Sequence, residues 1–242
     1  MVDVPTPNVL LASLPAAPRE ALLALYARQP QSGDDGCVHP IDATTRIAIE
    51  EGLELMRLVT QVGAQAVLEV GLAYGFSAQF LLAALEQQGG GQLVAIDPFQ
   101  GSDWHGIGCR LAEASVAASP AGRLRFRWLG ERSDHALPQL ERSGERFGLI
   151  FVDGYHRFDD VLIDLTLAAR LCRPGGVIVL HDLWLPAVRA VVAFVEANRP
   201  DLQRQSCSCR NLAVFVCCDS DRRNWDHFVP FASMGEPWLD EA

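Results

Sequence analysis

Four titratable residues follow directly on two apolar runs of this 242-residue sequence. They are Asp153 and His156 after the first run, and His181 and Asp182 after the second. Carboxylates and imidazoles together can hold a divalent cation, and a neutral imidazole can accept a proton near neutral pH. Each pair also suits a structural role, because Asp-Gly is a common turn and His181-Asp182 can begin a helix.

The two apolar runs place these residues in space. Phe147–Val152 and Val177–Leu180 read as parallel strands covered by helices on both faces, and Phe158–Cys172 reads as the helix between them. Ligands of open α/β sheets bind outside the carboxyl ends of the strands. We therefore expect the four side chains to converge near Gly71, with a metal and a base among them.

Gly71 belongs to the most specific motif of the chain, Val67–Ser77. An apolar strand runs into Glu69-x-Gly71-x-x-x-Gly75, after which a helix begins. A dinucleotide fingerprint has the form G-x-G-x-x-G, whereas its second glycine position holds Ala73 here and an acid precedes the first glycine. The motif thus favours a ligand with an amine and a ribose over NAD.

Two further strands predict more of this ligand site. Leu93–Ile96 ends in Asp97, whose carboxylate can accept both ribose hydroxyl protons, although a cap before Pro98 is the structural alternative. Arg125–Leu129 is a third strand, and Ser133 and Asp134 after it are ordinary helix-start residues. Trp104 lies in the loop that follows Asp97. It suits either a loop anchor or a contact with adenine or substrate.

From Ala66 to Cys218 the sequence resembles class I S-adenosylmethionine (SAM) methyltransferases, whose first motif has the E-x-G-x-x-x-G form. The strand-end residues narrow the resemblance to metal-dependent small-molecule O-methyltransferases of the catechol, mycinamicin and macrocin type. The resemblance implies SAM as cofactor and an adenine contact after the third strand. The implied cofactor-binding residues are Glu69, Gly71, Ala73, Gly75, Ser77, Asp97, Ser133, Asp134, Asp153 and Tyr155.

The same resemblance implies roles for the four titratable residues. Asp153, His181 and Asp182 match the metal ligands, and His156 matches the base, with Asp153 and His181 as further catalytic residues. His181 departs from the carboxylate of relatives, and magnesium prefers oxygen ligands. Magnesium or manganese is the first expectation. Iron, zinc, a site of Asp153 and Asp182 alone, and the absence of a metal stay open.

The expected fold is α/β: a Rossmann-like class I methyltransferase with a mostly parallel seven-stranded sheet, an antiparallel last strand and N-terminal helices. Residues 1–62 form a helical segment with amphipathic helices at Arg19–Gln29 and Ala43–Val62, expected to cover the substrate or to join subunits of a homo-oligomer. Residues 63–218 form the SAM-binding domain, and 219–242 form a tail without clear periodicity.

Seven cysteines include a C-x-C and a C-C pair that could suggest zinc. Gln203–Cys209 and Leu212–Cys218 instead read as a closing hairpin around Arg210-Asn211, in which the cysteines are small core residues. Stable disulfides are not expected in an intracellular chain.

The composition limits which partners and which cellular location we expect. A formal net charge of −10 disfavours nucleic acid, and no apolar run reaches membrane-spanning length. The first eighteen residues lack the basic start of a signal peptide, so we expect a cytoplasmic protein.

The predicted function is SAM-dependent methyl transfer to a hydroxyl of a small molecule, a sugar or a secondary metabolite. A metal-independent N-methyltransferase and a SAM-binding module without turnover are the alternatives. A binding module without turnover would explain neither His156 nor the pair of Asp153 and Asp182, since binding alone needs neither.

Overall fold

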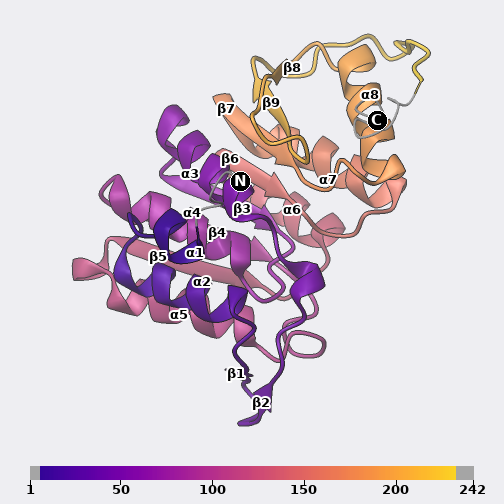
Figure 1. Ribbon diagram of the computed structural model, residues 1–242. Coiled ribbons are helices and arrows are strands. Elements are labelled where there is room, and N and C mark those ends of the chain that lie inside the picture. Colours follow the sequence, from indigo (N-terminus) through magenta and orange to yellow (C-terminus); the bar gives the residue numbers. More distant parts are fainter. Residues whose placement is uncertain (1–5, 233–242) are drawn as a thin grey trace, which may run out of the picture.

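The computed structural model describes residues 6–232, which form a seven-stranded sheet between two layers of helices (Figure 1). Five strands are parallel, and one edge of the sheet is completed by an antiparallel hairpin. In spatial order the strands are β5 (Leu124–Leu129), β4 (Gly91–Ile96), β3 (Ala66–Val70), β6 (Phe147–Val152), β7 (Cys172–Leu180), β9 (Ala213–Cys217) and β8 (Leu202–Gln205).

Alternation along the buried strands divides the core into two clusters. Val67 and Phe151 face one helical layer, whereas the neighbouring Leu68 and Ile150 face the other. The first layer contains α2 (Ala16–Tyr26), α3 (Ile49–Val62), α4 (Phe76–Gln87) and α5 (Ile107–Ala118), and the second contains α6 (Ser133–Arg142), α7 (Phe158–Leu171) and α8 (Pro186–Asn198). The expected sheet, with its antiparallel last strand, is confirmed.

Helix α5 was not anticipated from the sequence. It begins after Gly106, which has a left-handed backbone and offers no side-chain cap, and its buried positions include the small residues Gly108, Cys109, Ala112 and Ser115. Neither a start signal nor a strong apolar stripe therefore marks this helix. A second unanticipated feature is the small hairpin of β1 (Gln31–Ser32) and β2 (Val38–His39), which projects from the body at the end opposite α8 (Figure 1).

The N-terminal helices differ from the prediction in their bounds. A short α1 (Pro7–Leu10) precedes α2, and the expected helix over Ala43–Val62 is wrong in its first six residues. Ala43–Thr45 is a 3-10 turn in which the Asp42 carboxylate accepts a hydrogen bond from the Thr44 amide. The chain is then extended to Ala48, whose amide donates to Glu51 Oε2 at 2.6 Å. This contact fixes the start of α3.

The C-terminal hairpin is shorter than predicted. Residues 206–212 form a loop between β8 and β9, so Cys207 and Cys209 are not strand core residues. The Cys207 thiol donates to Glu54 Oε1 and the Cys209 thiol to the Glu50 carbonyl, both at 3.5 Å. Cys217 on β9 is a buried core residue as expected, and all seven cysteines are free.

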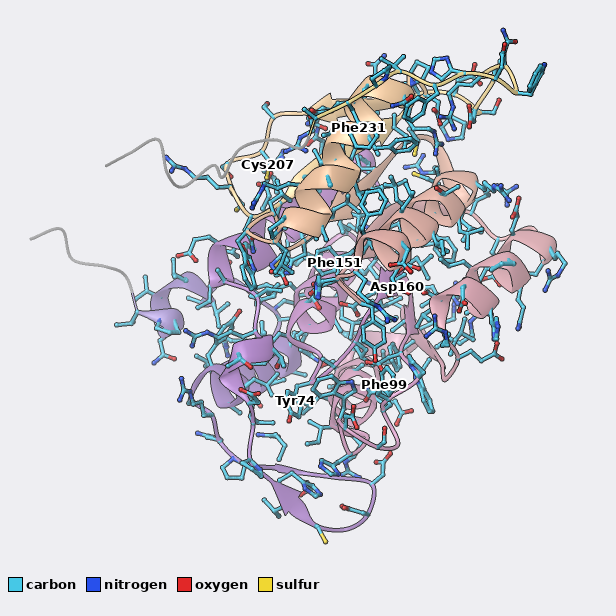
Figure 2. All side chains as sticks on the ribbon, turned by 90° about the vertical axis from the view of Figure 1, so that its right-hand side faces the viewer. Tyr74, Phe99, Phe151, Asp160, Cys207 and Phe231 are labelled. Carbon is cyan, nitrogen blue, oxygen red and sulfur yellow. The ribbon has the colours of Figure 1, made fainter. Side chains whose placement is uncertain are left out.

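The tail packs on α8 over its described part, which ends at residue 232. Asn198 exchanges two hydrogen bonds with the Val229 backbone, and the Phe231 ring, labelled in Figure 2, lies edge-on to Phe194 of α8. Trp225 is 97% exposed. Trp238 lies outside the described residues.

Candidate active site

The glycine loop between β3 and α4 is fixed by contact with the neighbouring strand end. Gly71 has φ +92°, and its amide donates to the Ile96 carbonyl at 2.9 Å. A Cβ at Gly71 would lie 2.0 Å from the backbone oxygen of Asp153. Any side chain at position 71 would therefore clash with the backbone that follows β6, whether or not a cofactor is bound.

Glu69 is a buried acid just before this loop. One carboxylate oxygen accepts a hydrogen bond from the Ser77 hydroxyl of α4, and the other has no partner among the described residues. Burial, with smaller contributions from Asp153 and Asp97, raises the pKa of Glu69 to about 8. An unpaired buried carboxylate oxygen is costly in isolation and fits a ligand that brings a cationic amine.

Asp97 holds the glycine loop from the side. Its Oδ2 accepts hydrogen bonds from the Leu72 and Ala73 amides at 3.2 and 2.8 Å, and its Oδ1 accepts one from the Phe99 amide at 2.8 Å. Ala73 has the left-handed φ of +47°, a conformation these bonds help to hold. Asp97 also lines a cavity, where Oδ1 retains accepting capacity for a hydroxyl.

The cavity beside Asp97 is about 290 Å³ in volume, and its lining includes three aromatic residues, Phe99, Trp104 and Tyr155. Phe99 and Tyr155 lie edge to face, with ring centroids 5.8 Å apart, on the wall of this cavity. Phe99 and Asp160, both labelled in Figure 2, belong to the lining, together with Arg132. Neither Phe99, Arg132 nor Asp160 was singled out from the sequence.

The two helix-start residues of α6 differ in their position relative to this cavity. Ser133 lines it as predicted, whereas Asp134 is not among the lining residues and pairs with Arg132 at 3.1 Å. The expected contact of Asp134 with adenine is thus not supported by its position. Trp104 lines the cavity and lies edge-on to Tyr74 at 5.2 Å.

A second cavity adjoins the first and is walled by the strand-end residues. The two share Gly71, Ala73, Trp104, Asp153 and Gly154. The lining found only in the second cavity comprises Thr44, Thr45, Arg46, Ile47, Leu72, Phe76, Ser77, His156, His181 and Asp182. A ligand in the first cavity would therefore face the strand-end cluster across the glycine loop.

The structure brings the four predicted residues together. Asp153 Oδ1 lies 3.0 Å from His181 Nδ1 and 3.3 Å from His156 Nε2. Asp182 Oδ1 lies 3.2 Å from the same His181 nitrogen, and Asp182 Oδ2 lies 3.1 Å from His156 Nε2. Asp182 has φ +60°, so its backbone is strained at the site. Each histidine is thus placed between the same two carboxylates.

Two more residues complete the cluster and were missed in the sequence. Glu51 Oε2, from α3, lies 3.2 Å from His181 Nε2. Asn211 Nδ2, from the loop before β9, lies 3.0 Å from the same nitrogen and donates to Asp182 Oδ1 at 3.3 Å. These residues are remote in sequence from the strand ends, and no motif marks them.

The carboxylates change the acid–base properties of both imidazoles in the metal-free protein. Burial opposes the charge on His181, but Asp153, Glu51 and Asp182 outweigh it and raise the pKa of His181 to about 11. Burial likewise opposes the charge on His156, and the hydrogen bond and charge of Asp153 raise its pKa above the usual value. Burial also opposes ionisation of Asp153, yet His181 and His156 lower its pKa. In this state His156 is therefore neutral, and able to accept a proton, only at a higher pH than an unperturbed histidine.

The donor set of the cluster fits a divalent cation. Asp153, His181 and Asp182 each offer one ligand atom, and these atoms lie within 4.8 Å of one another. Two carboxylates and an imidazole suit manganese, iron or zinc as well as magnesium, and the cation would replace the proton that His181 otherwise carries.

Comparison with known proteins accords with this geometry. Residues 68–183, from β3 to the residue after Asp182, match the family model described as "Methyltransferase domain". Over these residues the chain is similar to methyltransferase domains. The region contains the glycine loop, Asp97 and the strand-end cluster, and the match confirms the resemblance to SAM-dependent methyltransferases expected from these motifs.

Proteins similar to this chain include one named "Putative O-methyltransferase" from Mycobacterium avium. It is 33% identical over 156 residues, which are 60% of this chain and 64% of the relative. The chain therefore spans about two thirds of the length of that relative.

Solved structures share the fold. The O-methyltransferase TomG from Streptomyces achromogenes, solved with SAM, has a TM-score of 0.61 at 22% identity, covering 86% of this chain and 92% of TomG. Cofactor-bound Rv0187 from MTB has a TM-score of 0.63 at 20% identity, covering 90% and 100% of the two chains. Within residues 6–232, no helix is long and apolar enough to span a membrane.

Proposed function

We propose that this chain transfers the methyl group of SAM to a hydroxyl of a small molecule. The observation that carries the proposal is the boundary between the two cavities. They meet at the glycine loop and Asp153, with the aromatic lining on one side and the paired carboxylates and imidazoles on the other. A methyl donor and a hydroxyl acceptor can then be held face to face.

SAM is assigned to the first cavity. Its amine would satisfy the unpaired oxygen of Glu69, and its ribose would donate to Asp97 Oδ1. The rings of Phe99 and Tyr155 offer an apolar surface to the adenine. Ser133 lines the same cavity, where its hydroxyl would lie beside the bound adenine.

The acceptor hydroxyl is assigned to the second cavity, where His156 is the base. Its imidazole takes the hydroxyl proton as the oxygen attacks the methyl carbon in line with sulfur, giving a methyl ether and S-adenosylhomocysteine (SAH). Asp153 and Asp182 hold His156 in place. A divalent cation held by Asp153, His181 and Asp182 would lower the pKa of the hydroxyl.

The resemblance and one structural neighbour support the proposed substrate class. TomG is described as involved in tomaymycin synthesis, which supports a secondary metabolite, and the sugar-modifying families in the resemblance support a glycoside. An N-methyltransferase would need no cation, because a free amine is already nucleophilic. Cytoplasmic location and a homo-oligomer stay predictions.

A methyl-transfer assay tests the proposal. Purified protein is incubated with labelled SAM and a metabolite extract of the host, with and without a chelator. We expect label in a methyl ether, a reduced rate of transfer with the chelator, and partial rescue of Asp153→Asn by excess Mn²⁺. Label only in methylated amines, unaffected by the chelator, would favour N-methyl transfer, and absence of transfer to any acceptor would favour a binding module.

A further inference from the structure

We propose a second metal site, for Zn²⁺, formed by Asp35, His39 and His105 where the β1–β2 hairpin meets the loop after β4. The three residues offer ligand atoms within 4.8 Å of one another. They share no member with the strand-end cluster, and neither His39 nor His105 has a role in the proposed methyl transfer.

The backbone already joins the two segments that carry the donors. Asp34 of the hairpin donates its amide to the His105 carbonyl at 2.8 Å, and the Gly33 amide donates to the Cys37 carbonyl at 2.8 Å. A Cβ at Gly106 would lie 2.0 Å from Asp34 Oδ2, so the hairpin and the loop are in direct contact. The donors therefore meet on a preformed junction.

The carboxylate of the site is oriented by its own hairpin. Asp35 Oδ1 accepts a hydrogen bond from the Cys37 amide at 2.9 Å, and both Asp35 oxygens lie within 3.0 Å of His39 Nε2. Such a support fixes the direction of a carboxylate, as hydrogen bonds to metal ligands commonly do.

The second imidazole lies against the first and lacks a comparable partner. The rings of His39 and His105 are stacked with centroids 3.6 Å apart and an interplanar angle of 4°. Among the described residues, no hydrogen bond reaches a ring nitrogen of His105. Two imidazoles and one carboxylate are a donor set that Zn²⁺ takes in tetrahedral sites, with water at the fourth position. On binding, the two rings would tilt from their parallel stacking toward the shared ion.

The position of the site suggests what the ion does. His105 directly follows Asp103 and Trp104, which line the first cavity, and the hairpin leads through residue 42 to Thr44 and Thr45 of the second cavity. A Zn²⁺ ion bound here would fasten the loop after β4 to the segment that walls the second cavity. It would act by holding structure and not by contact with the transferred methyl group.

Zinc titration tests the site in a background that removes the competing cluster. Asp153→Asn/Asp182→Asn protein is titrated with Zn²⁺ by calorimetry, and bound Co²⁺ is followed by its visible absorption. His39→Ala and His105→Asn each remove one donor, and asparagine is chosen at position 105 because the backbone there has φ +52°. His135→Asn, an exposed histidine on α6, is the matched control.

We expect one equivalent of Zn²⁺ and a tetrahedral Co²⁺ spectrum in the background protein and in the His135→Asn control, and loss of both in either donor variant. Circular dichroism verifies that each variant is folded. The same titration is repeated with Asp153 and Asp182 unchanged. There the His105→Asn variant should bind one equivalent of Zn²⁺ fewer than the His135→Asn control. Equal stoichiometry in the donor variants and the control, or absence of Zn²⁺ binding in the background protein, would overturn the proposal.

Discussion

The cofactor side and the acceptor side of the cleft are built in different ways. On the cofactor side, backbone amides of the glycine loop bind Asp97, and a Gly71 side chain is excluded by the Asp153 backbone. On the acceptor side, side-chain contacts join Glu51 of α3, the histidines and acids that follow β6 and β7, and Asn211 of the loop before β9. Changes on the first side should therefore affect folding and cofactor binding, and changes on the second should affect turnover.

The largest effect is expected from Gly71→Val. Its Cβ would overlap the Asp153 backbone, and valine strongly disfavours φ +92°, so stability should fall by about 4 kcal/mol or more. Thermal unfolding measures the loss. Gly101→Val is the matched control, because a Cβ there meets no atom within 4 Å. A folded Gly71→Val protein with native stability would contradict the contact between the strand ends.

Glu69→Gln should change both the pH dependence of stability and the affinity for SAM. The pKa of Glu69 is raised to about 8 by burial, against about 4.3 in an unfolded chain, so the folded state holds an extra proton between these values. Stability of the cofactor-free protein should thus fall as pH rises from about 4.5 to about 8, at up to ~1.4 kcal/mol per pH unit.

The variant should lose that slope in thermal unfolding across the same pH range. Calorimetry should show weaker SAM binding at neutral pH, because the carboxylate that meets the amine is gone. An unchanged slope together with unchanged SAM affinity would mean that Glu69 neither titrates nor contacts the cofactor.

His156→Ala should lower turnover by about a hundredfold while SAH affinity stays within about twofold, because His156 lines only the second cavity. Since the pKa of His156 is raised, activity of the metal-free protein should increase with pH through a pKa above the usual 6.5. Added Mn²⁺ should shift that acidic limb to lower pH, because the cation offsets the two carboxylates. If His181→Ala removes the acidic limb and His156→Ala does not, the base is His181.

The smallest effects should distinguish two residues near the adenine end. Phe99→Ala removes a ring from the cavity wall and should weaken SAH binding about tenfold. Asp134→Ala loses only an ion pair with the half-exposed Arg132, so binding should change by less than about twofold. Calorimetric titration of both variants checks this order, and a larger effect at Asp134 would restore its predicted contact with adenine.

The same comparison explains what the sequence could predict. The cofactor side is encoded locally, because Glu69, Gly71 and Asp97 stand at fixed spacings around strands that the apolar runs reveal. Asp153, His156, His181 and Asp182 were also accessible, because parallel strands bring their carboxyl ends to one edge.

Glu51 and Asn211 were not accessible, since their roles depend on how α3 and the loop before β9 pack onto that edge. Part of the rise in the pKa of His181 depends on the same packing, because Glu51 comes from α3. Residues 206–209 were predicted as strand because Cys207 and Cys209 look like core residues until α3 is placed beside them.

The most direct test of this division is a paired measurement on Asp182→Asn. Asparagine tolerates the φ of +60° at this position, and Asp182 lines the second cavity without lining the first. On one preparation, SAH affinity is measured by calorimetry and methyl transfer by label incorporation. Our account predicts that turnover falls at least about a hundredfold while SAH affinity changes by less than about twofold. A parallel loss of both, or retention of full turnover, would contradict it.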